Sequence, residues 1–365
     1  MKTLALCMIV KNEEAVLDRC LQCVHHIVDE LIIVDTGSTD KTVEIAKKYT
    51  DKIYHFTWQN DFATARNFSF SKATADYILW LDADDILLPE EQNKLLLLKE
   101  NLNGQVDCYF LKYDMNIANE NQGSFYFYRE RIVKNNKNFF WQGVVHEFLV
   151  IYGNISQLDI TITHQKSTLH PRKNYRNLLC YCQKFAKTGT ATAREIYYFA
   201  RELMDNKLYP LAISFLKYFL LQKSGWKEDK ICACLLLSNA YLEVNAKKQA
   251  LNALYKSFAY TSFRPEICCA IGNIFLNNLQ YYKAIFWFNL AILSANEGKK
   301  SVFYCQDYAT FIPYMQLCVC YDRLNNIEKS YFYNKLAGMY KPNHKDYLHN
   351  KAYFEKILNC KGEIK

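Results

Sequence analysis

The first part of the chain alternates short hydrophobic segments with amphipathic ones. Hydrophobic runs rich in Ile, Val and Leu predict β-strands at residues 4–10, 30–34, 52–56 and 77–81. The segments between them have the periodicity of helices, at residues 13–26, 39–49 and 61–72. Two later runs predict antiparallel strands added to the same sheet, at residues 108–116 and 125–134. Strands that alternate with single helices form a mainly parallel sheet with right-handed crossovers, so the pattern predicts an α/β domain.

From about residue 173 the strand pattern gives way to long helical patterns that recur. A small residue opens the second helix of each predicted pair, at Ala212, Ala250, Ala284 and Ser330. The steps between these positions are 38, 34 and 46 residues, and the last step contains an insertion around residues 296–307. A period near 34 residues with small residues at such positions resembles the tetratricopeptide repeat (TPR).

We therefore predict two domains, an α/β domain over residues 1–170 and an all-α, TPR-like domain over residues 171–365. Stacked helical repeats bury their faces against one another and leave a concave surface. That surface either binds a peptide or protein, forms a homodimer, or only supports the first domain.

Composition narrows the class of protein. Half of the residues are apolar and the formal net charge is +8, without a dense block of Lys and Arg, so we expect no nucleic-acid partner. The first residues lack the features of a signal peptide, and no apolar run approaches the ~18 residues that span a bilayer. These features predict a cytoplasmic protein without a transmembrane segment. In that reducing compartment we expect the 14 cysteines to be mostly small buried hydrophobes rather than disulfides.

Acidic residues follow two of the predicted strands. Asp35 comes after the second strand, and Asp82, Ala83 and Asp84 follow the fourth. Ligands in open α/β sheets bind outside the carboxyl ends of the strands. Neighbouring carboxylates repel one another unless a cation offsets their charge, and carboxylates with phosphates are what Mg²⁺ or Mn²⁺ prefers. The alternative for residues 82–84 is that they form a solvated loop without a ligand.

Polar residues also stand in two other segments. Asn12 and Glu13 follow the first strand, where they either face a ligand or cap a helix. His146 and Glu147 lie in Trp-Gln-Gly-Val-Val-His-Glu, and His164 ends a later hydrophobic run. A Glu beside a His near aromatic residues is a candidate general base and ligand, although a lone His is more often structural.

Taken together, these segments resemble the family 2 glycosyltransferases of the GT-A fold over roughly residues 1–180. The resemblance rests on an ordered set of motifs: Val-Lys-Asn-Glu-Glu, Asp-Thr-Gly-Ser-Thr-Asp, Ala-Arg-Asn, Leu-Asp-Ala-Asp-Asp and Trp-x-Gly-x-Val-His-Glu. The attached helical repeats further resemble the bacterial subgroup that includes the sublancin-type peptide S-glycosyltransferases. The resemblance implies an inverting, metal-dependent hexosyltransferase that moves glucose or an N-acetylhexosamine from a UDP-sugar to an acceptor.

The same resemblance implies a role for each site residue. The donor-binding set would comprise Asn12, Glu13 and Asp35 at the nucleoside, Arg66 and Asn67 near the diphosphate, and Asp82 with Ala83 at the ribose. Asp84 would hold Mn²⁺ or Mg²⁺, and a histidine on a later strand would complete the metal shell; His164 fits that position better than His146, and both stay open. Glu147 would be the catalytic base, in a place where the family more often has a Glu-Asp pair.

Three alternatives remain open on the sequence. The acceptor is a peptide or protein, a lipid-linked glycan or a polysaccharide, and the attacking atom is O, N or S. Nucleotidyl transfer to a sugar phosphate would use a similar sheet, but such enzymes open with a Gly-rich loop that Val10–Glu14 lacks. The third alternative is a non-catalytic scaffold that works through the repeats. The intact acids Asp35, Asp82 and Asp84 argue against this alternative.

Overall fold

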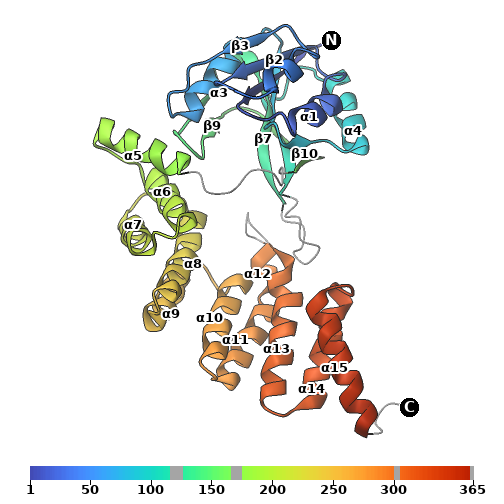
Figure 1. Ribbon diagram of the computed structural model, residues 1–365, viewed down its shortest axis with the longest axis vertical. Helices are drawn as coiled ribbons and strands as arrows, with labels where there is room; N and C mark the ends of the chain where they lie inside the picture. The colour runs from blue at the N-terminus through green and yellow to red at the C-terminus, as the bar shows by residue number, and fades with distance from the viewer. Residues whose placement is uncertain (116–125, 166–174, 300–304, 362–365) are drawn as a thin grey trace. The chain divides into compact units, whose positions relative to one another are not determined.

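The computed structural model describes residues 1–115, 126–165, 175–299 and 305–361. The described residues form two compact units, the first reaching to Ala191 and the second beginning at Thr192. The predicted boundary between residues 170 and 171 lies outside the described residues, as do the ends of the predicted strands at 116 and 125, so that boundary stays a prediction. Figure 1 shows both units, coloured along the chain.

The first unit is a mixed sheet flanked by helices. Its eight-stranded sheet has the order β3-β2-β1-β4-β7-β6-β10-β5, and a separate hairpin pairs β8 with β9. The strands are β1 (Leu4–Val10), β2 (Glu30–Asp35), β3 (Ile53–His55), β4 (Tyr77–Trp80), β5 (Asp85–Ile86), β6 (Cys108–Asp114), β7 (Tyr126–Lys134), β8 (Phe140–Gln142), β9 (Phe148–Val150) and β10 (Ile155–His164). The helices are α1 (Leu17–Val24), α2 (Thr42–Ala46), α3 (Phe62–Phe70), α4 (Pro89–Glu100) and α5 (Arg176–Thr188).

Parallel pairing in the middle of this sheet confirms the predicted fold class. β1 lies between β2 and β4 and runs parallel to both, and β3 and β10 also pair in parallel with β2 and β6. β7 is antiparallel to both β4 and β6, as the sequence predicts for the two later strands. The result is a mixed, mainly parallel sheet with its parallel core nearest the N-terminus.

Two hydrophobic layers cover the faces of the sheet. Alternate β1 residues Leu4, Leu6 and Met8 pack with α1, α2 and α4 in one cluster. Cys7 and the opposite faces of β2 and β4 pack with α3 and the β8–β9 hairpin in another. The strands are buried on both faces because helices or the hairpin cover each side, which explains why they read as continuous hydrophobic runs.

The helices of this unit are shorter than the sequence predicts. The predicted helix 13–26 begins only at Leu17, because Asn12 adopts a left-handed φ of 57° and the chain first turns, with Val16 N donating to Glu13 O at 3.0 Å. Residues 39–49 contain only the short helix α2. The third helix is close to its prediction, and Asp61 caps it by accepting from Thr64 N at 3.0 Å.

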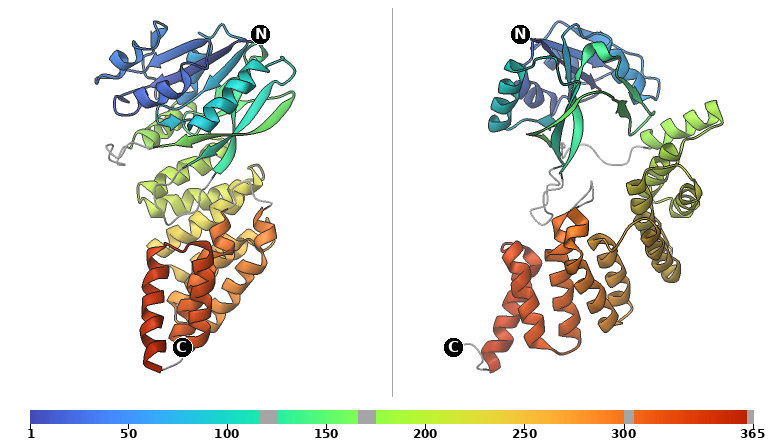
Figure 2. Two further views of the ribbon diagram at one scale, coloured as in Figure 1. Left: turned by 90° about the vertical axis from the view of Figure 1, so that its right-hand side faces the viewer. Right: turned by 180° about the vertical axis from the view of Figure 1, so that it is seen from behind.

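The second unit consists of helix pairs that follow one another along the chain (Figure 2). The pairs are α6 (Ala193–Asp205) with α7 (Tyr209–Leu221), α8 (Lys227–Glu243) with α9 (Lys247–Lys256), α10 (Pro265–Asn277) with α11 (Tyr281–Leu293), and α13 (Phe311–Arg323) with α14 (Ile327–Tyr340). The short α12 (Ala295–Lys299) lies in the predicted insertion, and α15 (Lys345–Lys361) follows the last pair. This confirms a TPR-like helical region.

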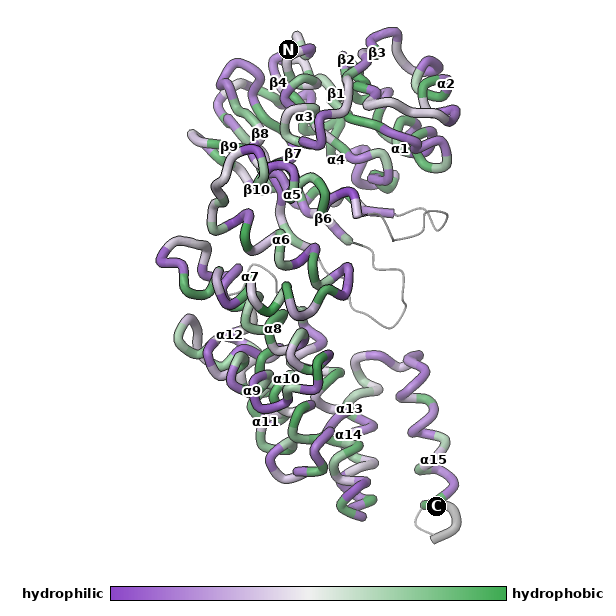
Figure 3. The backbone as a smooth tube through the Cα atoms, turned by 60° about the vertical axis from the view of Figure 1, so that its left-hand side comes forward, coloured by the Kyte–Doolittle hydropathy of each residue, from purple (hydrophilic) through white to green (hydrophobic). Residues whose placement is uncertain are grey.

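The repeat is visible in the turn inside each pair. One residue with positive φ stands in every turn, at Lys207, Asn245, Leu279 and Asn325. These residues precede the predicted small residues Ala212, Ala250, Ala284 and Ser330 by a constant five positions, and all four small residues are 0% exposed. A small side chain at this point lets the second helix approach the first closely. The helices of this unit alternate between hydrophilic and hydrophobic residues along their length, as expected of helices with one buried side (Figure 3).

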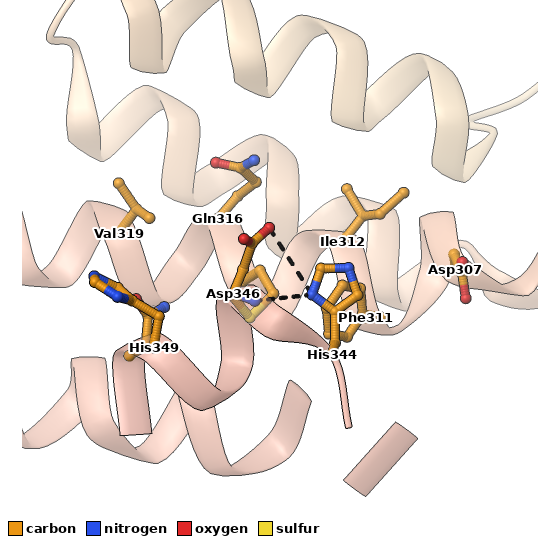
Figure 4. Close-up of a pocket in the computed structure, with 10 residues that line it drawn as sticks. Asp307, Phe311, Ile312, Gln316, Val319, His344, Asp346 and His349 are labelled. Carbon is orange, nitrogen blue, oxygen red and sulfur yellow. Dashed lines mark hydrogen bonds and ion pairs between the residues drawn. The ribbon is translucent and has the colours of Figure 1, made fainter. Parts of the chain in front are cut away.

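The second unit also contains a cavity of about 490 Å³ between α13 and the start of α15 (Figure 4). Its walls combine the apolar side chains of Phe311 and Ile312 with the polar ones of Gln316 and His349. Among the described helices of both units, none has the length and apolar character needed to span a bilayer. The described cysteines are all free and most are buried, as the sequence predicts.

Candidate functional site

The carboxyl ends of β1, β2 and β4 meet at one edge of the sheet. Because these strands are parallel neighbours, Val10 stands beside Asp35 in register, and Cys7 stands beside Trp80. The loops that leave these strand ends carry most of the polar residues that the sequence singles out. The fold therefore gathers segments from residues 12, 35 and 82 at a single place, in agreement with the general position of ligand sites in such sheets.

Asn12 and Asp35 hold the first two of these loops together. Asn12 accepts from Thr39 N at 2.8 Å through Oδ1, while its own N–H donates to Ser38 Oγ at 3.0 Å. The buried Asp35 carboxylate accepts from the backbone N–H groups of Ser38 and Gly37, at 3.0 and 3.2 Å. Both side chains therefore stabilise the loops themselves. The helix-capping alternative for Asn12 is wrong, because α1 begins at Leu17 with Val16 at its N-cap position, and contact of Asn12 with a ligand stays a prediction.

The turn after β4 places three acids in different surroundings. Asp82 is one-third exposed at its side chain, Asp84 is about one-quarter exposed, and Asp85 is fully buried. Ala83 between them is buried. The turn is closed by Asp85 N, which donates to Asp82 O at 3.0 Å, and by Asp82 N, which donates to the Asp85 carboxylate at 2.9 Å. The turn thus presents Asp82 and Asp84 outward and keeps Asp85 inside.

A group with metal-ligating character lies beside this turn. Single ligand atoms of Asp84, Asp85 and His164 all lie within 4.8 Å of one another. His164 Nδ1 is 3.3 Å from an Asp84 oxygen and 3.4 Å from an Asp85 oxygen. Burial lowers the pKa of His164, but its contacts with the two carboxylates outweigh this and raise the pKa to about 9. His146 does not belong to this group among the described residues.

Glu13 adds a further carboxylate to the same negative region. Its pKa is raised to about 7, first by burial and then by the negative charges of Asp84 and Asp82. Carboxylate oxygens and one imidazole are a donor set suited to a divalent cation, and mutual repulsion among these acids is what such an ion relieves. The residues present therefore fit the Mg²⁺ or Mn²⁺ that the resemblance implies.

Arg66 joins two of the acids at the other side of the site. This buried guanidinium donates through Nε to Glu147 at 2.6 Å and through Nη2 to Asp82 at 2.6 Å. It lies 4.8 Å from the ring centre of Trp80 and 5.0 Å from that of Trp141. Partial burial raises the pKa of Asp82, but the charges of Arg66 and Arg131 more than offset this and hold it well below its usual range.

Asn67 has its side-chain amide engaged with the backbone. Its Nδ2 donates to Trp141 O at 3.0 Å, and its Oδ1 accepts from Trp141 N at 2.7 Å. These two bonds pin helix α3 to strand β8, next to the segment that carries Glu147. The sequence motif Ala-Arg-Asn thus combines one residue that contacts the acids with one that fixes the position of the strand.

Helix α5 contributes contacts close to the same loops. Tyr181 donates from its hydroxyl to Val145 O at 2.9 Å, and Asn60 donates to the Gln183 side chain at 2.7 Å. Arg176 at the start of this helix lies 4.9 Å from the ring centre of Phe62, and its charge lowers the pKa of Glu13. Sequence analysis did not single out these residues, since nothing in their spacing relates them to a strand end.

Arg131 and Tyr113 are two further residues of the site that the sequence analysis missed. Arg131 donates to Asp85 at 3.0 Å, and the Tyr113 hydroxyl donates to the same carboxylate at 2.9 Å. The sequence offers no signal for Arg131, because it stands at the end of a charged run, Arg129-Glu130-Arg131, that reads as solvated. A charged side chain that the fold buries has to find a buried partner, and the acids after β4 supply it.

The N-terminal part of the chain matches a known protein family. Residues 5–152 match the model of Glycosyl transferase family 2. The first unit therefore contains a GT-A-like domain of this family, and the resemblance seen in the sequence is confirmed for it. The match includes Asn12, Asp35, Arg66, Asp82 and Glu147, and it ends before His164.

Two relatives match parts of the chain. A TPR repeat-containing protein of Synechococcus elongatus is 47% identical over 95 residues, 26% of this chain and 24% of that protein. The SPbeta prophage-derived glycosyltransferase SunS of Bacillus subtilis is 24% identical over 271 residues, 69% of this chain and 63% of that protein. The chain thus spans less than two thirds of the length of either relative.

Among solved structures, the glucosyl-3-phosphoglycerate synthase from Mycobacterium tuberculosis, in complex with Mg²⁺ and uridine-diphosphate, matches part of the chain. It is 15% identical, with a TM-score of 0.35, over 52% of this chain and 81% of that chain.

Proposed function

We propose that the protein is an inverting, metal-dependent glycosyltransferase that moves a hexose or N-acetylhexosamine from a UDP-sugar to a polypeptide. The observation that carries this proposal is the arrangement of Asp84, His164 and Glu13 around one negative region, with Glu147 held by Arg66 on its other side. A cation-binding group and a positioned carboxylate, both at the carboxyl edge of a family 2 glycosyltransferase sheet, are the two parts that this reaction requires.

The donor would bind along the loops after β1, β2 and β4. Asn12, Glu13 and Asp35 would contact the nucleoside, with Asp35 offering a carboxylate acceptor to a base N–H or a ribose hydroxyl. Asp82 and the backbone of Ala83 would face the ribose. Asp84 and His164 would hold Mn²⁺ or Mg²⁺, and a bound divalent ion offsets the negative charge that develops on a departing diphosphate. Binding a negatively charged nucleotide without such an ion would be opposed by the acids gathered here.

Glu147 is our candidate for the general base. Its carboxylate accepts from Arg66 Nε at 2.6 Å, and its side chain is only 12% exposed. Arg66 is enclosed between Trp80 and Trp141 and already pairs with Asp82, so we propose that it orients Glu147 instead of contacting the diphosphate. Glu147 would take the proton from the acceptor nucleophile as that atom attacks the anomeric carbon opposite the leaving group, which inverts the configuration.

The acceptor is proposed to be a peptide or protein bound by the helical unit. The cavity beside α13 offers an apolar wall together with Gln316, His349 and Asn350, and such side chains can pair with peptide groups while apolar walls take side chains. Gln316→Trp should fill this cavity and raise the acceptor KM while donor hydrolysis in the absence of acceptor stays unchanged. An unchanged KM for every polypeptide acceptor would favour a lipid-linked glycan or polysaccharide instead.

The test of the central proposal is release of UDP from a panel of UDP-sugars, with Mn²⁺ or with EDTA. We expect metal-dependent release from one donor, and a loss of at least 100-fold in kcat/KM for Asp84→Ala, because a lost metal ligand removes the charge stabilisation. Asp159→Asn is the matched control, since Asp159 is an exposed acid on the strand that carries His164. No binding of any nucleotide sugar, with or without metal, would indicate a scaffold built on the repeats.

A further inference from the structure

Arg131 occupies an unusual position in the sheet. Tyr109 on β6 pairs with Ile132, but its neighbour Phe110 pairs with Glu130, so Arg131 is the extra residue of a β-bulge in β7. A bulge re-aims a side chain that regular alternation would send to the other face, and bulges are frequent next to active sites. Here Arg131 has no partner residue on β6 and its side chain is nevertheless fully buried.

The guanidinium of Arg131 is fully buried and only partly hydrogen-bonded. Arg131 is 0% exposed and lies 3.9 Å from the ring centre of Trp80 and 4.3 Å from that of Tyr113. Nη1 donates to Asp85 at 3.0 Å and to Trp80 O at 3.2 Å. Within the described part of the chain Nε and Nη2 have no hydrogen-bond partner. A buried charge with unpaired donors lowers the stability of the fold. A hydrophobic residue at position 131 would avoid this cost, so stability alone does not account for the arginine.

Asp85, the partner of Arg131, has both of its oxygens occupied. Oδ2 accepts from Arg131 and from Asp82 N, and Oδ1 accepts from the Tyr113 hydroxyl. His164 Nδ1 lies 3.4 Å from Oδ1, and β5 and β10 bring Asp85 and His164 opposite each other in register. A carboxylate that makes these contacts has little capacity left to coordinate an ion, whereas the Asp84 carboxylate is partly exposed and pairs with His164 at 3.3 Å.

We propose that Asp85 and Arg131 form a positioning pair for the cation site, and that Asp85 is not itself a metal ligand. This inference rests on the proposed function and deepens it. Arg131 fixes the Asp85 carboxylate from the bulge in β7. Asp85 then holds the backbone of Asp82 on one side and the imidazole of His164 on the other. The ligands Asp84 and His164 are kept in place because the residues flanking them are tied to one buried carboxylate.

The experiment measures Mn²⁺ affinity of the full chain with saturating UDP, by the electron paramagnetic resonance signal of free Mn²⁺. We expect Asp85→Asn and Arg131→Lys each to weaken Mn²⁺ binding by about 10–100-fold, as is usual when residues behind metal ligands are changed. Lys cannot reproduce the planar fork of Arg. Tyr113→Phe removes one bond to Asp85 and should weaken binding by about fivefold. The double variant should be no weaker than Asp85→Asn alone, because Arg131 acts through Asp85.

Glu30→Gln is the matched control. Glu30 is a buried carboxylate paired with Lys52 at the opposite end of β2, so its variant loses stability of the same kind without touching the site. If Arg131→Lys does not fold, Asp85→Asn and Tyr113→Phe still test the pair, since both are nearly isosteric.

Three outcomes would overturn the inference. Wild-type affinity in all variants would leave the glycosyltransferase proposal standing and remove the pair from it. Complete loss of binding in Asp85→Asn with full binding in Arg131→Lys would make Asp85 a ligand. A wild-type protein that binds UDP but no Mn²⁺ would overturn both the pair and the metal-dependence of the proposed reaction.

Discussion

The two units bury their residues in different ways. The first unit gathers buried charges at the carboxyl edge of the sheet, where Arg66 and Arg131 lie over aromatic rings and Arg131 pairs with Asp85. The second unit also buries a charge, Arg264, but its recurring feature is a buried small residue, such as Ala250 or Ala284, five positions after a left-handed turn residue. Buried charge is costly and collects where chemistry needs it, whereas buried small residues serve close packing. A cluster of buried charges at a strand edge thus marks the candidate site, and a regular spacing of buried small residues marks the repeats.

The two units also differ in net charge. Residues 1–191 carry 22 Lys and Arg against 23 Asp and Glu, while residues 192–365 carry 23 against 14. The modest positive charge of the whole chain thus comes from the helical unit. A near-neutral unit with concentrated acids suits a cation and a diphosphate, whereas a positive helical unit would attract an acidic acceptor. Changes in the two units should consequently have separable effects.

The largest expected effect is on chemistry in the first unit. Glu147→Gln should lower kcat by about 10²–10⁴-fold, because the amide cannot take a proton from the acceptor. The KM for the UDP-sugar should change little, since the variant keeps an acceptor oxygen for Arg66. Steady-state transfer assays against the identified donor measure both quantities. Glu30→Gln serves again as the buried-acid control, and activity of Glu147→Gln near the wild-type value would remove Glu147 from the reaction.

A smaller effect, on stability alone, is expected in the second unit. A methyl group on Gly272 would lie 2.7 Å from the ring of the buried Phe288, so Gly272→Ala should destabilise the helical unit by about 1–3 kcal/mol. UDP binding should be unaffected. Thermal unfolding and nucleotide titration measure the two properties, with the exposed Asn277→Ala on the same helix as control. A parallel loss of UDP affinity in Gly272→Ala would contradict the separation of the two units.

The smallest effect concerns the pH dependence of the metal-free protein. The folded-state pKa of His164 is raised to about 9 from an ordinary value of 6.5. Protonated His164 therefore stabilises the fold fully below about pH 6.5, and this contribution is lost as pH rises through about 9. We expect on the order of 1–2 kcal/mol after allowance for solvent screening. His164→Gln should flatten the dependence of the unfolding free energy over that window, and an unchanged slope would show that another group titrates there.

The sequence predicted the elements and the acids at the strand ends well. Asp35 and Asp82 each follow a hydrophobic run, and parallel strands necessarily bring their carboxyl ends to one edge. The helical repeats were equally visible, because close packing requires the same small residue in every pair. Helix lengths were less predictable. The first helix begins late because Asn12 adopts a left-handed conformation, and that conformation depends on hydrogen bonds to Ser38 and Thr39.

Contacts between distant segments lay beyond the sequence pattern. Arg66 meets Glu147 across 81 residues, and nothing in either motif indicates which acid the guanidinium selects. Arg131 could not be assigned because its direction depends on a bulge, and a bulge shifts register without leaving a periodic signal. The role of Arg131 is thus set by a local irregularity, and those of Tyr113 and Tyr181 by contacts with distant segments, not by position at a strand end.

The aromatic enclosure of Arg66 also makes the protein its own optical probe. Trp80 and Trp141 stand edge to face, with ring centres 4.8 Å apart, and Arg66 lies over both. The emission wavelength of an indole ring shifts with the electric field across it. Any event that redistributes charge around Arg66 should therefore shift the wavelength of maximum tryptophan fluorescence. The chain has five tryptophans, and Trp80→Phe and Trp141→Phe would show which of them reports. Donor binding could then be followed in real time without a label.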